Sequence, residues 1–122
     1  MPPTFGGTQR LPRLAGRKRA LELLLTGDPF PPQRALEIGL VNMIVPHDDL
    51  LPAARELAGR IMRHSPLAVS SIITAVTRGL NMSIGEGLLV ESEQFAAMAP
   101  THDLGEGLAA WIGRRTPNYA GR

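Results

Sequence analysis

Residues 65–79 read SPLAVSSIITAVTRG and contain the signals of one complete helix. Ser65 is a favoured N-cap residue, and the proline that follows it suits the first helical position. Apolar residues then recur at helical spacing at Val69, Ile72, Ile73 and Val76. A capping box, Ser83-Ile84-Gly85-Glu86, predicts a second helix that runs to Met98 and stops before Pro100. The sequence therefore predicts a helical pair.

Helical patterns continue on both sides of this pair. Apolar spacing and glycine or proline breaks predict helices at 8–15, 17–25, 33–38, 50–63 and 103–114. The last of these opens at Asp103, which the pattern predicts as a cap with Glu106 in the first turn. Leu40 to Val45 predicts one brief strand, which leaves its backbone unpaired unless another segment joins it. The expected class is mainly α with one short strand, in a chain that packs on a larger protein or on its own copies.

Composition excludes several classes of protein. With 43% hydrophobic and 20% charged residues, the 122-residue chain is typical of one small globular domain. Cysteine is absent, which excludes disulfide frameworks, thiolate metal sites and cysteine nucleophiles. No apolar run approaches the ~20 residues of a membrane helix, and no signal peptide is recognisable. We expect a cytoplasmic protein with no membrane partner.

Positive charge is concentrated near the N-terminus. Arg10, Arg13, Arg17, Lys18 and Arg19 occur with no acidic residue before Glu22. This Arg10–Arg19 patch is either a helix face that pairs with acids elsewhere, or a contact for phosphate on a cofactor or nucleic acid. It lacks interleaved aromatic residues, so nucleic acid is the weaker of these interpretations.

Familiar catalytic patterns are missing. The three histidines, at 47, 64 and 102, have no ligand-type partner at helical spacing, so no metal site is predicted. Glu91 and Glu93 lie two residues apart and point to different helix faces, which argues against a joint acid–base role. Trp111 and Tyr119 stand out in a chain with few aromatic residues, and they are more typical of core or interface anchors than of stacking platforms.

Three motifs in order resemble the crotonase superfamily, the enoyl-CoA hydratases and isomerases. They are Pro3-Thr4-Phe5-Gly6-Gly7-Thr8-Gln9-Arg10-Leu11, the run from Leu25-Thr26-Gly27-Asp28 through Ala35-Leu36-Glu37-Ile38-Gly39-Leu40-Val41-Asn42 to Val45-Pro46, and Thr101-His102-Asp103 through Glu106-Gly107 and Ala110-Trp111 to Arg115-Thr116-Pro117-Asn118-Tyr119. The resemblance covers only the C-terminal part of the family's α/β spiral. It implies that residues 1–47 end the crotonase core, with substrate-pocket loop, short helices and short strand. Residues 48–122 would form the helical region for oligomerisation and for covering the coenzyme A channel.

The resemblance implies reversible hydration of 2-enoyl-CoA to 3-hydroxyacyl-CoA by the parent protein. The family's oxyanion hole and its two glutamates belong to a preceding part, so no catalytic residue is expected in this chain and the isolated chain should be inactive. No cofactor is implied, since coenzyme A is part of the substrate. The residues that the resemblance assigns to substrate binding are Pro3, Thr4, Gly6, Gly7, Trp111, Arg115 and Tyr119. Family members often have glycine where Thr4 stands, which leaves room for a different acyl shape.

Other interpretations stay open at this point. The superfamily also includes enoyl-CoA isomerases and acyl-CoA hydrolases, so another reaction of this kind is one alternative. A helical RNA-binding or assembly module that uses the Arg10–Arg19 patch is another, and a coenzyme A-binding domain without chemistry is a third. The expected assembly is a homo-oligomer, a trimer or a dimer of trimers.

Overall fold

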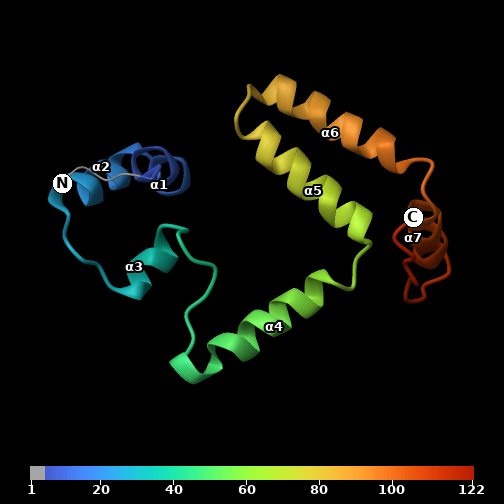
Figure 1. Ribbon diagram of the computed structural model, residues 1–122, viewed down its shortest axis with the longest axis horizontal. Coiled ribbons are helices and arrows are strands. Elements are labelled where there is room, and N and C mark those ends of the chain that lie inside the picture. The colour runs from blue at the N-terminus through green and yellow to red at the C-terminus, as the bar shows by residue number, and fades with distance from the viewer. Residues whose placement is uncertain (1–4) are drawn as a thin grey trace. The chain divides into compact units, whose positions relative to one another are not determined.

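The computed structural model describes residues 5–122, which are mainly helical, as the sequence predicts (Figure 1). The predicted Pro3 and Thr4 of the substrate pocket lie outside these residues. The helices are α1 (Gly7–Ala15), α2 (Arg17–Thr26), α3 (Pro32–Glu37), α4 (Leu50–Ile61), α5 (Pro66–Gly79), α6 (Ile84–Met98) and α7 (His102–Ile112), with a 3₁₀ turn at His47–Asp49 before α4. The chain divides into two compact units, Met1–Leu51 and Pro52–Arg122.

The predicted strand at 40–45 is wrong. These residues form loop, and no strand occurs anywhere in residues 5–122. The physical reason is that no second extended segment lies alongside this one within those residues, so its N–H and C=O groups have no ladder to join.

In the first unit, α1 and α2 pack against each other through small side chains. Ala15 and Ala20 are both buried, and Gly16 between the helices has φ of 80°. Only glycine adopts such a φ without strain, so this residue permits the sharp turn from one helix to the next. Ala35 and Ile38 are the other two buried hydrophobic residues within 5–51.

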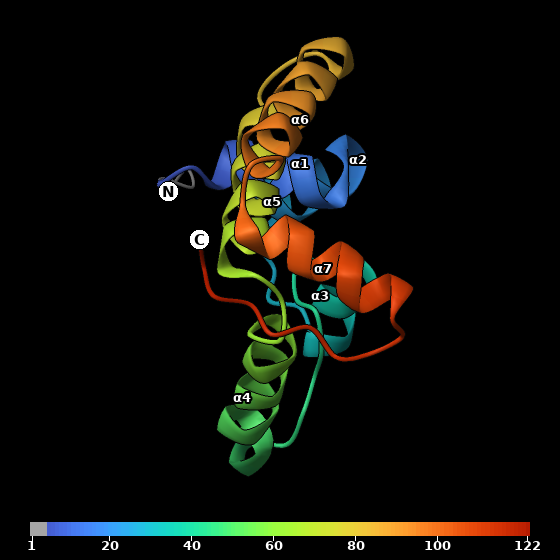
Figure 2. The same cartoon turned by 90° about the vertical axis from the view of Figure 1, so that its right-hand side faces the viewer.

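In the second unit, α5 and α6 lie side by side (Figures 1 and 2). Both predicted caps are confirmed. The Ser65 hydroxyl accepts a hydrogen bond from the N–H of Ala68, while Ser83 and Glu86 form a reciprocal capping box. These caps satisfy N–H groups that the first helical turn would otherwise leave without partners.

The start of α7 differs from the prediction. Its N-cap is Thr101, whose hydroxyl accepts a hydrogen bond from the N–H of Leu104 at 3.2 Å, so Asp103 lies inside the first turn rather than at the cap. This shift frees the Asp103 carboxylate for contacts outside its own helix.

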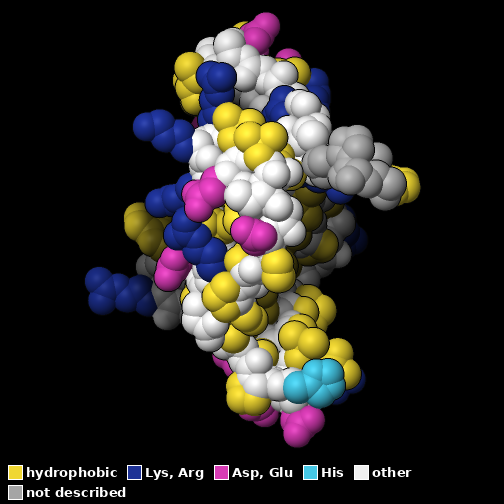
Figure 3. Space-filling view, turned by 90° about the vertical axis from the view of Figure 1, so that its left-hand side faces the viewer, with side chains coloured by type: hydrophobic (Ala, Val, Ile, Leu, Met, Phe, Trp, Pro, Cys, Tyr) yellow, Lys and Arg dark blue, Asp and Glu magenta, His cyan; other side chains and the backbone are white. Residues whose placement is uncertain are grey.

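Large apolar side chains remain at the surface of these helices. Figure 3 shows hydrophobic side chains standing among charged ones on one face of the molecule. On α5 and α6, Ile72, Ile73 and Phe95 are 62%, 60% and 68% exposed. Within residues 5–122, no helix has both the length and the apolar character that crossing a bilayer requires.

Candidate functional site

The C-terminal tail is anchored by a buried carboxylate at the start of α7. Asp103 is only 1% exposed. Its carboxylate accepts hydrogen bonds from the Ser65 hydroxyl at 2.6 Å and from the N–H groups of Ala120 at 2.7 Å and Gly121 at 3.1 Å. Its own N–H donates to the carbonyl of Arg122 at 3.1 Å. One residue therefore joins α7, the beginning of α5 and the end of the chain.

These contacts also set the charge of Asp103. The hydrogen bond from Ser65 is the largest effect, and together with the tail N–H groups it holds the pKa of Asp103 below its ordinary value, although burial opposes the shift. Asp103 therefore gives up its proton at a lower pH than an ordinary aspartate does. The sequence pattern predicts Asp103 only as a cap, because Ser65 lies far away along the chain.

A second carboxylate, one helical turn further along α7, holds the middle of the tail. Glu106 accepts two hydrogen bonds from the Arg115 guanidinium, at 2.6 and 2.8 Å, and a third from the N–H of Asn118 at 2.7 Å. Such a two-pronged pair fixes the guanidinium in orientation as well as position. With Arg115 as the largest cause, the pKa of Glu106 falls from 4.5 to about 2, and that of Arg115 rises above its ordinary value.

Acid should therefore loosen the tail in a defined pH range. Since the folded-state pKa of Glu106 lies below the unfolded value, its stabilising contribution is complete above pH 4.5 and is lost as the pH falls through about 2. We expect the melting temperature of the chain to drop across this range. The melting temperature of the Glu106→Gln variant should be lower at neutral pH and should fall less steeply as the pH is lowered. An equally steep drop in that variant would contradict the assignment to Glu106.

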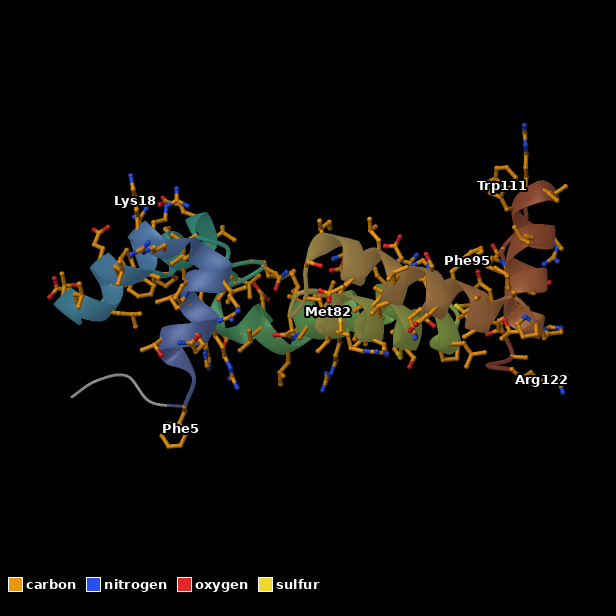
Figure 4. All side chains as sticks on the ribbon, turned by 90° about the horizontal axis from the view of Figure 1, so that it is seen from above. Phe5, Lys18, Met82, Phe95, Trp111 and Arg122 are labelled. Atoms are coloured by element: carbon orange, nitrogen blue, oxygen red, sulfur yellow. The ribbon has the colours of Figure 1, made fainter. Side chains whose placement is uncertain are left out.

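The tail brings three of the predicted substrate-binding residues together. Trp111, Arg115 and Tyr119 all line a surface pocket of about 510 Å³, and the Tyr119 ring lies against Gly107. A methyl group on that glycine would come within 3.3 Å of the tyrosine hydroxyl, so a larger residue there would require the tyrosine to shift by a few tenths of an ångström. Trp111 is 79% exposed and projects from the end of α7 (Figure 4). The pocket therefore combines an aromatic wall with an arginine that Glu106 holds in place.

The predicted glycines of the first motif lie in the other unit, at the start of α1. Gly6 caps this helix with φ of 86°, and its carbonyl accepts hydrogen bonds from the N–H groups of Gln9 and Arg10. Phe5 beside it also has a positive φ, 56°, and is 95% exposed. Gly7 is the first residue of α1. The two glycines thus form a tight turn with an aromatic side chain free at its surface.

Arg114 has an unusual backbone at the end of α7. Its φ of 49° is left-handed, and the N–H of Arg115 closes the turn on the carbonyl of Ala110 at 3.0 Å. This is the helix-ending position at which glycine is strongly preferred, because a Cβ atom is strained there.

Replacing Arg114 by glycine should therefore stabilise the chain. We expect Arg114→Gly to raise the free energy of unfolding by about 0.5–1 kcal/mol, since the strain of the left-handed arginine exceeds the added flexibility of glycine. Urea unfolding followed by circular dichroism measures the change. Arg114→Ala is the matched control, because it removes the same charge but keeps the Cβ atom, and it should give no such gain. Equal gains in both variants would assign the effect to charge rather than to backbone strain.

Known proteins share this sequence pattern and fold. A family profile described as "Enoyl-CoA hydratase/isomerase" matches residues 1–122. The chain is 39% identical over 117 residues to a crotonyl-CoA hydratase of Syntrophomonas wolfei, covering 96% of this chain and 45% of that relative. It is 38% identical over 120 residues to a 2,3-dehydroadipyl-CoA hydratase of Escherichia coli, and the match covers 98% of this chain and 47% of that relative.

Solved structures give the same result. The fold superposes on an enoyl-CoA hydratase from Bacillus anthracis with a TM-score of 0.94 and 40% identity, over 100% of this chain and 47% of that one. The chain thus spans about half the length of the curated relatives it matches. The resemblance carried by the three motifs is confirmed: this chain belongs to the enoyl-CoA hydratase/isomerase family, within the crotonase superfamily.

Proposed function

We propose that this chain is the C-terminal part of an enzyme that reversibly adds water to the double bond of 2-enoyl-CoA thioesters. Relatives at about 40% identity carry the names of hydratases of this kind, and this chain matches about half of their length. In this reaction a polarised thioester carbonyl lets water add at C3 while C2 receives a proton. In this proposal, the carboxylates that move these protons belong to the N-terminal part of the enzyme. This chain contributes binding surface rather than catalytic groups.

The binding surface that we propose consists of the residues assigned from the motifs. The pocket lined by Trp111, Arg115 and Tyr119 is the observation that carries the proposal, because coenzyme A offers both an extended apolar arm and phosphates. Glu106 holds Arg115 by two hydrogen bonds, so the guanidinium is pre-oriented before ligand arrives. In the other unit, Pro3, Thr4, Gly6 and Gly7 would form the wall of the acyl pocket.

Further protein would cover the apolar faces of α5 and α6. Their exposed side chains support the proposal of a homo-oligomer, a trimer or a dimer of trimers, in which copies shield these faces from water. We place this assembly in the cytoplasm, with acyl-CoA rather than nucleic acid as its ligand. An isomerase is the second candidate because the matching profile describes both activities.

Two measurements on the 122-residue chain test this proposal. Incubation with crotonyl-CoA should leave the enoyl absorbance unchanged, and turnover by the pure chain would contradict the absence of catalytic groups. Calorimetric titration with coenzyme A should detect binding that Trp111→Ala weakens. This side chain is 79% exposed, so its removal should leave the fold intact. Ile112→Ala, next to it and 75% exposed but outside the pocket lining, is the control. No binding of coenzyme A would contradict the proposed surface.

A further inference from the structure

The start of α2 carries a run of positive charge. Arg17, Lys18 and Arg19 are consecutive and exposed, and the first turn of this helix contains no acidic residue. Within residues 5–122, none of the three forms an ion pair. The nearest acidic residue along the chain is Glu22, and a lysine that precedes a glutamate by four residues is the weaker order for pairing. The three charges are therefore open to molecules in solution.

Local stability does not explain this run of charge. The N-terminal end of a helix has a partial positive charge, so acidic side chains are favoured there and cations are not. Three adjacent cations also repel one another. No side chain caps α2, because Gly16 holds the N-cap position. Loss of one positive charge from this turn would therefore relieve part of the repulsion.

Lys18 differs chemically from the arginines on either side of it. It is the only lysine in a chain with 13 lysine and arginine residues. A guanidinium stays protonated and is not a nucleophile, whereas a lysine amine can lose its proton and attack an acyl group. The Lys18 side chain is exposed and projects away from the helices (Figure 4). Lys18 therefore combines an accessible amine with surroundings that attract anions.

We propose that Lys18 is a site of acylation by acyl-CoA thioesters. These thioesters carry several negative charges on their phosphates, so Arg17 and Arg19 would raise their concentration next to the amine. The neutral ε-amine attacks the carbonyl carbon of the thioester, the C–N bond forms and the C–S bond breaks. Coenzyme A leaves as the thiol with the proton that the amine loses. The product is an uncharged amide, so the reaction also removes one of the three crowded charges.

This proposal takes its acyl donor from the proposed function, but it uses none of the residues proposed above for binding. The test incubates the 122-residue chain with acetyl-CoA, which has no double bond to hydrate. Mass spectrometry of fragments of the chain then locates the acetyl groups. We expect one acetyl group on Lys18, and we expect added salt to slow its attachment because salt screens the attraction between the thioester and the arginines.

Charge variants test the role of the neighbouring arginines. Arg17→Gln combined with Arg19→Gln should slow acetylation of Lys18 about tenfold, because a cluster of like charges raises the local concentration of an anion by a factor of this order. Arg55→Gln combined with Arg63→Gln is the matched control. Both of these arginines are exposed, lie in the other unit and form no ion pair within residues 5–122, so their loss should change little.

A neutral reagent separates attraction of the donor from reactivity of the amine. The N-hydroxysuccinimide ester of acetic acid is an uncharged acylating agent, so the variant that lacks Arg17 and Arg19 should slow its reaction with Lys18 far less. Equal slowing with both reagents would overturn the proposal, as would the absence of acetylation of Lys18 by acetyl-CoA. Binding of coenzyme A that Trp111→Ala weakens, without acetylation of Lys18, would overturn this proposal and leave the proposed function standing. Acetylation of Lys18 without such binding would support this proposal and contradict the proposed binding surface.

Discussion

Asp103→Ala should release the C-terminal tail and cause a large loss of stability. The change removes the acceptor for the Ser65 hydroxyl and for the N–H groups of Ala120 and Gly121, in a position that is almost fully buried. Buried donors left without partners are costly, because they have lost water and gained nothing in its place. We expect the melting temperature to fall by roughly 10 °C or more.

Amide hydrogen exchange locates this effect. In the unmodified chain the N–H groups of Ala120 and Gly121 should exchange slowly, and in Asp103→Ala they should exchange at rates near those of an unfolded peptide. The N–H of Leu80, at the far end of α5, bonds within the turn of its own helix and serves as the internal control. Asp103→Asn keeps the side-chain shape and one acceptor oxygen, so it should be intermediate. Slow exchange at Ala120 and Gly121 in the alanine variant would contradict the anchoring role.

Gly87→Val should separate α5 from α6. The Cα atoms of Gly79 and Gly87 face each other where the helices meet, and a Cβ atom built on Gly87 lies 3.5 Å from the Cα of Gly79 and 3.6 Å from its carbonyl oxygen. One methyl group therefore fits at ordinary contact distance. The two further methyl groups of valine cannot both turn away from a backbone that is so near, and overpacking of this kind costs about 1–3 kcal/mol.

Two matched variants test that explanation. Gly87→Ala should be neutral or stabilising by up to about 1 kcal/mol, because alanine favours the helix and its methyl group fits. Gly85→Val places the same side chain two residues earlier in α6, where nothing lies within 4 Å, so it should cost much less than Gly87→Val. Chemical unfolding followed by circular dichroism compares the three. Equal losses in both valine variants would assign the effect to helix propensity rather than to the crossing.

Local signals predicted most of the helices, because each depends on residues that are close in sequence. Ser65 with Pro66 and Ser83 with Glu86 begin α5 and α6 as expected, and Gly16 and Gly27 end α1 and α2. The two failures have a common cause. The strand at 40–45 required a partner that local sequence cannot supply. Thr101 rather than Asp103 caps α7, and the partners of Asp103 lie in segments distant along the chain.

The sequence by itself determined the helical class, the caps and the family, since helix signals are local and the three motifs lie in linear order. Only the tertiary structure decided what Asp103 and Glu106 do and where α5 and α6 touch. Those features depend on atoms that are adjacent in space but separated by many residues along the chain, such as Ser65 and Asp103. Their energy comes from burial and from the pairing of charges, and neither exists before the chain has folded.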